Sequence, residues 1–403
     1  MAKFSEWVGK IFSLTDHQPL ISIFGNETYT GKSVTPQTAL GVSTAWACIK
    51  LLTETLATMP VNMIEKLPND FRQKNNSHEL AWVLKIRPNK LMTPVEFFEC
   101  MQLNLLTSGN AYAEIEMNGV GDVIGLWPLL SQNMKVEQLD DGSVSYQFHT
   151  PKGVLIYKPE QILHIKLFGW SGLVGLSPIA YAAQSLGLEM ATLEFGSRWF
   201  GSGARPSGFI MFDQVLTKPQ RAQYKKNFET LHEGLARSHK LALLEAGMKY
   251  EAVTIPPNES QFLETRAFQV PEICRFYLVQ PHKVQHLDNA TYSNIEHQNL
   301  EFLQTTFRPY AIRWEQGMEN ALLKPQEKGS WQIRFNLNAL LRADTEARGN
   351  FYSQMVQNGL FSRNEVRSLE DVNPSDQAGA DDLTVQSNMI DLDQLQKVGK
   401  PND

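Results

Sequence analysis

The chain has 403 residues, of which 42% are hydrophobic and 20% are charged, and its formal net charge is −6. This composition excludes an intrinsically disordered chain, and the length allows two or three compact units with their own cores. The acidic balance argues against a protein that binds nucleic acid over its whole surface, although it leaves room for a local basic face.

Two further features narrow the class of protein. No apolar run reaches the roughly 18 residues of a membrane span, so no membrane span is expected. The three cysteines, Cys48, Cys100 and Cys274, are far apart and form no C-x-x-C motif. They predict reduced, buried thiols in a cytosolic protein, with no disulfide framework.

Residues 1–32 are amphipathic at their start but weakly patterned as a whole, and we expect a loosely ordered arm that could serve in interaction. Thr35 can cap a helix that starts at Pro36, and apolar residues then recur at helical spacing as far as Leu56. The alternating residues 60–66 predict a strand directly after this helix.

Thr93 and Pro94 repeat the same helix start, and Gly109 is expected to end that helix. Short alternating runs between residues 110 and 168 predict an antiparallel β-rich unit that packs on helices. The segment Leu-Asp-Asp-Gly-Ser-Val at 139–144 is typical of a hairpin turn.

Ser177 and Pro178 start a third helix, which we expect to continue to Phe200. A small α/β insertion follows, with strands near residues 207–212, 240–246 and 249–255 and a helix over 217–234. Residues 258–279 return as a helix that is bent or restarted at Pro271.

A polar loop precedes a predicted helix of about thirty residues, in which Ser293 and Glu296 fit a capping box. Pro309 lies in its middle and predicts a kink between Thr305 and Pro309, because proline lacks the backbone donor. Apolar residues recur in steps of three and four, which predicts a packing seam made of Leu300, Leu303, Phe307, Tyr310, Trp314, Met318 and Ala321.

Residues 345–374 predict a small helical module with Ser362 as the cap of its second helix. The end of the chain is acidic, with eight Asp or Glu against two Lys or Arg over residues 369–403. This balance predicts a polar tail without fixed structure.

The sequence carries no signature of an active site that we could recognise: neither G-x-S-x-G, H-E-x-x-H nor a phosphate-binding loop occurs. His282 and His286 are four residues apart, but two histidines alone make a weak metal site, and a structural role is favoured. Residues 198–249 hold nine Lys or Arg against four Asp or Glu. This basic stretch is either a solvated helix face or a surface for an acidic partner or nucleic acid.

Several segments, in this order, resemble the portal proteins of tailed bacteriophages, in the compact branch of that family. The resemblance covers about residues 33–375. It departs from the family pattern at "VQPHKVQHLD", where the family often has a second Pro and a Gly. The segments that carry the resemblance are "SVTPQTALGVSTAWACIKLLTETLATMPV", "MTPVEFFECMQLNLLTSGNAYAEI", "LWPL", "GLVGLSPI", "FGSRWFGSGARPSGFI", "LETRAFQVPEICRFYLVQPHKV" and "ATYSNIEHQNLEFLQTTFRPYAIRWEQGMENALL".

The resemblance implies an α+β portal fold with an α/β wing, a two-helix stem, a small α/β clip, a long kinked helix and a helical crown. The implied parts follow one another along the chain: arm 1–32, wing 33–176, first stem helix 177–202, clip 203–256, second stem helix 257–280, tunnel loop 281–293, long helix and return to the wing 294–335, crown 336–375, and acidic disordered tail 376–403.

The resemblance also implies a function that is structural and not enzymatic, with no cofactor and no metal. It implies a ring, usually of twelve subunits, at one capsid vertex of the virion, assembled in the host cytoplasm. Double-stranded DNA would pass through the ring during packaging and ejection. The implied partners are further copies of the chain, the large terminase, the head–tail adaptor, and the major capsid and scaffold proteins.

Two sets of residues are implied to face these partners. The tunnel loop would narrow the channel and contact DNA through Gln285, His286, Asp288, Asn289, Thr291 and Tyr292. The clip would dock the packaging motor and the adaptor through Lys218, Arg221, Lys225 and Lys226. The alternative interpretation of the chain is a cytosolic nucleic-acid-processing enzyme whose site is assembled from scattered acidic residues.

Overall fold

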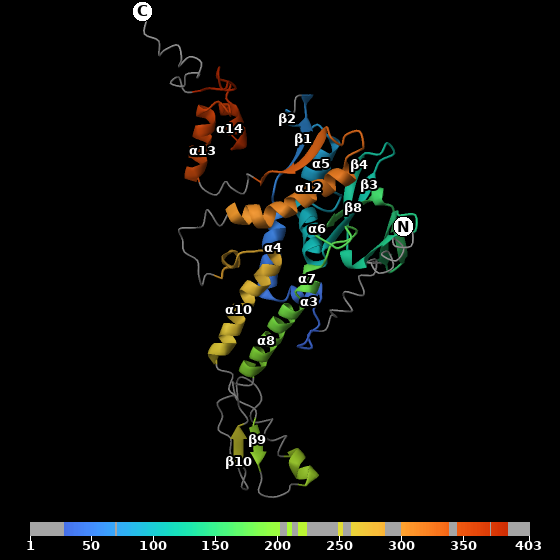
Figure 1. The fold of residues 1–403 in the computed structure, drawn as a ribbon, viewed down its shortest axis with the longest axis vertical. Helices are drawn as coiled ribbons and strands as arrows, with labels where there is room; N and C mark the ends of the chain where they lie inside the picture. The colour runs from blue at the N-terminus through green and yellow to red at the C-terminus, as the bar shows by residue number, and fades with distance from the viewer. Residues whose placement is uncertain are drawn as a thin grey trace, which may run out of the picture. The chain divides into compact units, whose positions relative to one another are not determined.

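The computed structural model separates into two compact units, Met1–Asn336 and Leu337–Asp403. It describes residues 28–68, 71–201, 208–211, 217–223, 249–252, 259–286, 300–337, 345–370 and 372–385. Helices and strands mix in both sequence and space, as predicted for an α+β chain (Figure 1).

The first unit opens with helices α3 (Pro36–Ala39) and α4 (Ser43–Ala57). Thr35 caps α3 as predicted, but the single helix expected from Pro36 is interrupted at residues 40–42. Gly41 and Val42 donate their N–H groups to the carbonyls three residues earlier, at 3.1 and 3.0 Å, and Val42 is extended. These hydrogen bonds to the third preceding residue form a tight turn in place of an α-helical turn. Hydrophobic spacing alone did not predict this interruption.

Helix α6 (Pro94–Ser108) begins and ends as predicted. Thr93 and Glu96 form a full capping box, with Glu96 accepting the Thr93 N–H at 2.7 Å. Gly109 closes the helix at φ 77°, and a Cβ there would lie 2.2 Å from the Leu176 carbonyl oxygen. Glycine is therefore required at this position both for its backbone angle and for the close approach of another segment.

Three three-stranded sheets form most of the β part of this unit, and all of their neighbouring strands are antiparallel. Helix α5 (Glu79–Lys85) lies between the second and third strands of the chain and was not predicted. The three strand orders are β11-β1-β2, β4-β3-β8 and β5-β6-β7. Their strands are β1 (Val61–Lys66), β2 (Arg72–Lys74), β3 (Asn110–Met117), β4 (Val123–Leu129), β5 (Met134–Gln138), β6 (Val144–Thr150), β7 (Gly153–Tyr157), β8 (Ile162–Lys166) and β11 (Trp331–Phe335).

The predicted β-rich unit at 110–168 therefore consists of two of these sheets. The expected hairpin turn joins β5 to β6, with the Leu139 N–H donating to the Ser143 carbonyl at 2.8 Å and Gly142 at φ 83°. Strand β11 pairs with β1 in register Met63 to Ile333, so the chain returns to its first strand after 270 residues.

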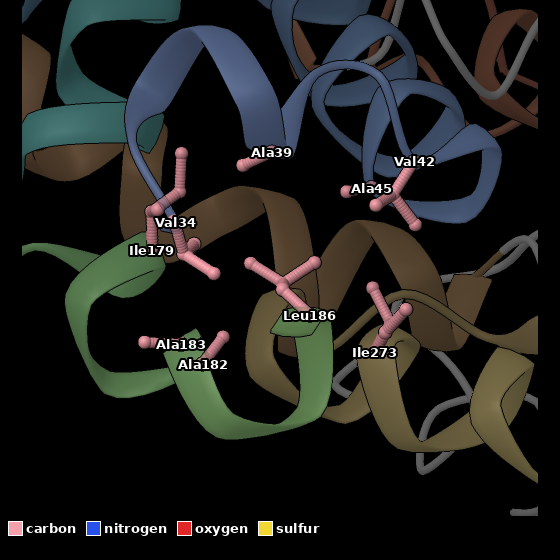
Figure 2. Packing of buried hydrophobic residues seen from close by; sticks show 9 residues of the cluster. All are labelled: Val34, Ala39, Val42, Ala45, Ile179, Ala182, Ala183, Leu186 and Ile273. Atoms are coloured by element: carbon pink, nitrogen blue, oxygen red, sulfur yellow. The ribbon is translucent and has the colours of Figure 1, made fainter. Parts of the chain in front are cut away.

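Helices α7 (Pro178–Tyr181) and α8 (Ala183–Gly201) form the third predicted helix with a short break at Ala182. Helix α10 (Glu259–Tyr277) runs beside α8 and contains Pro271 in its interior (Figure 1). Figure 2 shows the buried apolar cluster in which these helices pack with α3 and α4, namely Val34, Ala39, Val42, Ala45, Ile179, Ala182, Ala183, Leu186 and Ile273.

The cysteine prediction is confirmed for two of the three thiols. Cys48 on α4 and Cys274 on α10 are fully buried, with their Sγ atoms 3.8 Å apart, and Cys100 is only partly buried. Burial suits the reduced thiol because it behaves as a small apolar group.

The end of the arm differs from the prediction of weak order. Residues 28–32 form a turn on α8, in which the Thr30 hydroxyl donates to the Gly187 carbonyl at 3.0 Å and Lys32 pairs with Glu194. Gly187 makes this contact possible, since a Cβ there would lie 2.5 Å from the Thr28 side chain. Residues 1–27 lie outside the described part of the chain.

The second unit contains α13 (Thr345–Gln357) and α14 (Arg363–Leu369), and Ser362 caps α14 as predicted. The prediction of a disordered tail from residue 376 is wrong for residues 376–385. Asn364 binds the Asp381 carboxylate at 2.9 Å and donates its N–H to the Ala380 carbonyl at 3.0 Å. One buried asparagine thus holds an acidic segment that composition alone marks as unstructured.

Candidate functional site

The segment before the predicted tunnel loop is a short, well-defined turn. After α10 ends, Leu278 adopts φ 52°, a 3₁₀-helix η5 (Pro281–Val284) follows, and Gln285 adopts φ 64°. They are the two residues other than glycine with positive φ in the described part of the chain. Such backbone costs about 1–3 kcal/mol and persists where the surroundings fix it, often at functional sites.

The segment after the loop contacts the segment before it. The Thr306 hydroxyl donates to the Leu278 carbonyl at 2.5 Å, and the Lys283 ammonium lies 5.3 Å from the centre of the Phe302 ring. Two contacts thus join the stretch that ends at His286 to the stretch that starts at Leu300. We call these contacts the base of the loop, because the thirteen residues of the loop lie between the two stretches in the sequence.

The structure describes only some of the residues predicted for the tunnel loop. Gln285 and His286 lie at the edge of the base, with the His286 N–H donating to the Pro281 carbonyl at 3.1 Å. The other predicted loop residues, Asp288, Asn289, Thr291 and Tyr292, lie outside the described residues, as does the predicted capping box. Burial, followed by the charge of Lys283, lowers the pKa of His282, and burial also lowers the pKa of Lys283.

The predicted irregularity of the long helix has a specific form. Phe302–Phe307 is a π-helix, labelled η7, and α12 (Arg308–Leu322) follows with Pro309 in its first turn. Proline suits that position because it needs no backbone donor there. The Thr305 hydroxyl donates to the Glu301 carbonyl at 2.7 Å within the π-helix. The π-helix overlaps the residues at which we predicted a kink, Thr305 to Pro309. The kink itself stays a prediction.

The apolar seam of this helix is buried along most of its length. Phe307, Trp314 and Met318 are fully buried, but Leu300 is exposed, which differs from the prediction. Leu300 begins the described helix directly after the loop, so it lies beyond the part of the seam that packs on the sheets. The seam fixes α12 against β8 and β11, and α12 follows directly on η7, which carries Thr306.

The predicted docking residues belong to the insertion between α8 and α10. Strands β9 (Gly208–Met211) and β10 (Lys249–Ala252) pair in antiparallel fashion, as predicted, and residues 218–223 are helical. Lys218 and Arg221 are exposed on that helical turn. Lys225 and Lys226 lie outside the described residues, so the structure shows half of the predicted basic group.

Comparison with known proteins decides the family. The family model for phage portal proteins matches residues 43–371. The chain belongs to the phage portal protein family. Its sequence is 37% identical to the portal protein of Enterobacteria phage HK97 over 346 residues, which cover 85% of this chain and 81% of that protein. It is 31% identical to the probable portal protein of Streptomyces phage phiC31, over 89% and 80% of the two chains.

The portal fold is also found in solved structures. A chain from the neck of a native gene transfer agent particle, computed with C12 symmetry, matches with a TM-score of 0.57. That match has 23% identity and covers 91% of this portal protein and 99% of the other chain. The resemblance drawn from the sequence is therefore confirmed, and the enzyme alternative loses its support, since the portal family is structural.

Residues of α12 and β8 line a cleft of about 660 Å³ in this portal protein. Four cations line it, but Lys324 pairs with Asp122, and the Lys328 ammonium donates to the Asn320 carbonyl at 2.8 Å. Within the ranges that the structure covers, no three His, Cys, Asp or Glu side chains lie close enough to hold a metal ion. Likewise, no helix among these residues is both long and apolar enough to cross a bilayer.

His164 on β8 lines the cleft of the portal protein. Its ring connects two sheets, because it lies within hydrogen-bond distance of Asn110 on β3 and of Tyr146 on β6. Its Nε2 lies 3.0 Å from Asn110 Oδ1, which also accepts the Gly175 N–H at 2.7 Å, and its Nδ1 lies 3.2 Å from the Tyr146 hydroxyl. The amide oxygen is an acceptor, so Nε2 carries the proton and Nδ1 accepts from Tyr146. Burial, followed by the charge of Lys166, lowers the pKa of His164 to about 3.

This shifted pKa predicts a loss of stability in acid. Between pH 6.5 and pH 3 the unfolded chain binds a proton at His164 that the folded chain does not, so the free energy of unfolding falls as the pH falls. The slope from one such group is at most about 1.4 kcal/mol per pH unit. Urea unfolding across this range should show a smaller slope for His164→Gln. The exposed His149→Gln is the control and should keep the full slope; equal slopes in all three proteins would contradict the assignment.

Proposed function

We propose that this chain forms a ring of twelve subunits at one vertex of a capsid, and that double-stranded DNA passes along its axis during packaging and ejection. The observation that carries the proposal is the fixed base of the loop, where the Thr306 hydroxyl donates to the Leu278 carbonyl, 28 positions earlier in the chain. Family membership and the twelvefold symmetry of the similar neck structure support it. The ring acts in the virion after assembly in the host cytoplasm, and it acts without catalysis.

The loop between the two anchored stretches is the channel element of this proposal. Asp288, Asn289, Thr291 and Tyr292 are polar and, together with Gln285 and His286, offer short-range contacts without strong positive charge. A protein that makes 6–10 phosphate contacts binds DNA tightly and with a steep salt dependence. An acidic subunit with a polar loop avoids such binding, so DNA can slide past it.

The insertion between α8 and α10 is the proposed clip, which would dock the large terminase and later the head–tail adaptor. Its basic residues set the rate of encounter with an acidic partner and its salt sensitivity more than the final affinity. The ring would also contact the major capsid and scaffold proteins.

Charge reversal of Lys218, Arg221, Lys225 and Lys226 to Glu should slow terminase binding to the assembled ring by at least about tenfold at low salt. The difference from wild type should shrink as salt is added, because screening weakens long-range attraction. Surface plasmon resonance at several salt concentrations measures both effects.

The matched control reverses four exposed cations elsewhere in the first unit, Arg72, Lys74, Lys90 and Lys152. It changes the net charge by the same amount and should leave terminase binding close to wild type. Equal slowing by both quadruple variants would show a general effect of net charge and would remove the docking assignment from the insertion.

The proposed function is tested by complementation of a host phage that lacks its own portal gene. Expression of this chain with its cognate terminase and capsid proteins should give particles filled with DNA. Particles that assemble but stay empty, although the chain is present as a ring at the vertex, would contradict the DNA-channel role.

A further inference from the structure

Two buried thiols lie against each other between helices that are far apart in the sequence. Cys48 lies on α4 and Cys274 lies on α10, 226 positions later, and their Sγ atoms are 3.8 Å apart. Both side chains are fully buried. A disulfide joins sulfur atoms about 2.0 Å apart, so a movement of less than about 2 Å brings the two thiols into bonding distance.

The hydrogen bond between the two thiols makes them chemically unequal. With Cys48 as the donor, this bond lowers the pKa of the Cys274 thiol. The same bond, followed by burial, raises the pKa of Cys48. The thiolate is the reactive form of cysteine. Cys274 is therefore the nucleophile of the pair, and Cys48 is the second thiol placed beside it.

The end of α10 that carries Cys274 is weakly tied to the rest of its helix. Pro271 lies in the helix interior, where it lacks the N–H that would bond the carbonyl of residue 267. Cys274 follows three residues later, and the helix ends at Tyr277. A helix end of this length can open locally while the unit stays folded, and such opening admits an oxidant as small as hydrogen peroxide.

Cys274 also lies one helical turn before the base of the loop. Leu278, whose carbonyl accepts the Thr306 hydroxyl, follows four residues later. The Val279 N–H donates to the Cys274 carbonyl at 3.1 Å, which ties the turn after α10 to the helix end. The next element, η5, itself contacts α4. A covalent bond from Cys274 to α4 therefore holds the base of the loop against α4 as well.

The third thiol of the chain provides an internal comparison. Cys100 on α6 is partly buried, and its Sγ lies 3.9 Å from Asn104 Nδ2 on the same helix. Burial raises the pKa of Cys100, which disfavours its thiolate. A reaction that is specific to the pair of thiols should therefore leave Cys100 unchanged.

We propose that Cys48 and Cys274 form a disulfide once the protein has left the reducing cytoplasm, and that this bond fixes α10 to α4. The Cys274 thiolate attacks one oxygen of hydrogen peroxide, and the O–O bond breaks. Cys274 becomes a sulfenic acid, and the departing hydroxide takes up the thiol proton to give water. The Cys48 sulfur then attacks the Cys274 sulfur, the S–O bond breaks, and a second water leaves with the Cys48 proton. Two thiols and one peroxide thus give one disulfide and two waters.

The reactivity of the pair rests on its geometry, and the timing of the reaction rests on the proposed function. A virion protein is assembled in the host cytoplasm, where glutathione keeps thiols reduced, and it is then released to surroundings in which disulfides persist. The pair therefore acts as small apolar packing during assembly and as a covalent cross-link in the released particle.

Treatment of the purified full-length chain with hydrogen peroxide tests the reactivity. The number of free thiols should fall from three to one. Peptide mapping without reductant should show the peptides of Cys48 and Cys274 joined, with the loss of two hydrogen atoms. The thermal midpoint should rise by about 5 °C, because the cross-link restricts the unfolded chain.

Two variants serve as controls for this treatment. Cys100→Ser should still form the bond and gain the same stability, whereas Cys48→Ala should form no internal bond and should gain none. In wild type, three free thiols after treatment, a sulfinic acid at Cys274 without joined peptides, or joined peptides that contain Cys100 instead would each overturn the proposal.

Alkylation of particles before and after release tests the timing. Thiols are blocked with N-ethylmaleimide in denaturant, either in intact infected cells or in purified released particles. The bond between Cys48 and Cys274 should be absent from the cells and present in most subunits of the released particles. Its presence in the cells, or its absence from the particles, would overturn the proposal. Native mass of the peroxide-treated chain reports the ring separately, so a chain that forms the bond without a ring would contradict the proposed function alone.

Discussion

Trp314→Ala should lower the free energy of unfolding by about 3–5 kcal/mol, the usual cost of removing a large buried aromatic side chain. Trp314 is fully buried on α12, where its ring meets the Phe98 ring edge-on at 5.3 Å between centroids. Its indole N–H donates to Gln102 Oε1 at 2.8 Å, and Gln102 is itself fully buried. The substitution therefore leaves both a cavity and a buried acceptor without a donor.

The effect is large because α12 is the element that joins the sheets. The free energy of unfolding of such domains is only about 5–15 kcal/mol. The variant should therefore lose a large part of this free energy and should yield less folded protein. Urea unfolding of the purified chain measures the change. Trp314→Phe keeps a ring but loses the hydrogen bond, and it should cost less. Trp82→Ala, at a tryptophan that is 62% exposed, is the control; a similar midpoint for both alanine variants would contradict the packing assigned to Trp314.

Replacement of residues 287–292 by a shorter Gly-Ser linker should leave the ring assembled and should strongly reduce the length of DNA retained per particle. Assembly should survive because the base of the loop is independent of its tip: Thr306 still binds the Leu278 carbonyl, and the buried seam of α12 is unchanged. DNA retention should suffer because the polar loop is the element proposed to narrow the channel.

DNA length per particle, measured by pulsed-field electrophoresis after particle purification, decides this prediction. The control shortens another exposed turn, Asp140–Gly142 between β5 and β6, which the proposal places away from the DNA. Full-length genomes in the loop variant would show that residues 287–292 serve only as a connector.

Local signals in the sequence predicted the helix starts and the strands. Thr93 with Glu96 and Ser362 with Glu365 act within a few residues, so their capping boxes can be read directly. Alternation predicted β3 to β7 for the same reason, because successive side chains of a strand point to opposite faces of the sheet. The tight turn at Gly41 escaped notice because the apolar spacing continues through it.

Features that depend on distant contacts could not be predicted. The π-helix at Phe302–Phe307 and the left-handed Leu278 depend on each other through Thr306, and no local pattern links residues 28 positions apart. The close approach of Cys48 and Cys274 depends on the packing of α4 on α10. The order of residues 376–385 depends on Asn364, whose side chain meets both Asp381 and Ser375.

The same limit applies to the candidate site. The polar loop and Pro309 were recognised because composition and a single proline mark them, whereas the anchors Leu278, Phe302 and Thr306 carry no special residue type. A left-handed leucine gives no sequence signal, since leucine rarely adopts that conformation. The resemblance to portal proteins supplied the role of the loop, and the structure added the residues that hold its two ends together.

The most direct test of the account is the native mass of the purified full-length chain, combined with electron microscopy of the same sample. Twelve chains of 45.6 kDa predict a particle of about 550 kDa with a hole along its axis. A stable monomer or dimer at all accessible concentrations, or a large particle without an axial opening, would contradict the assignment of this protein as a ring for DNA passage.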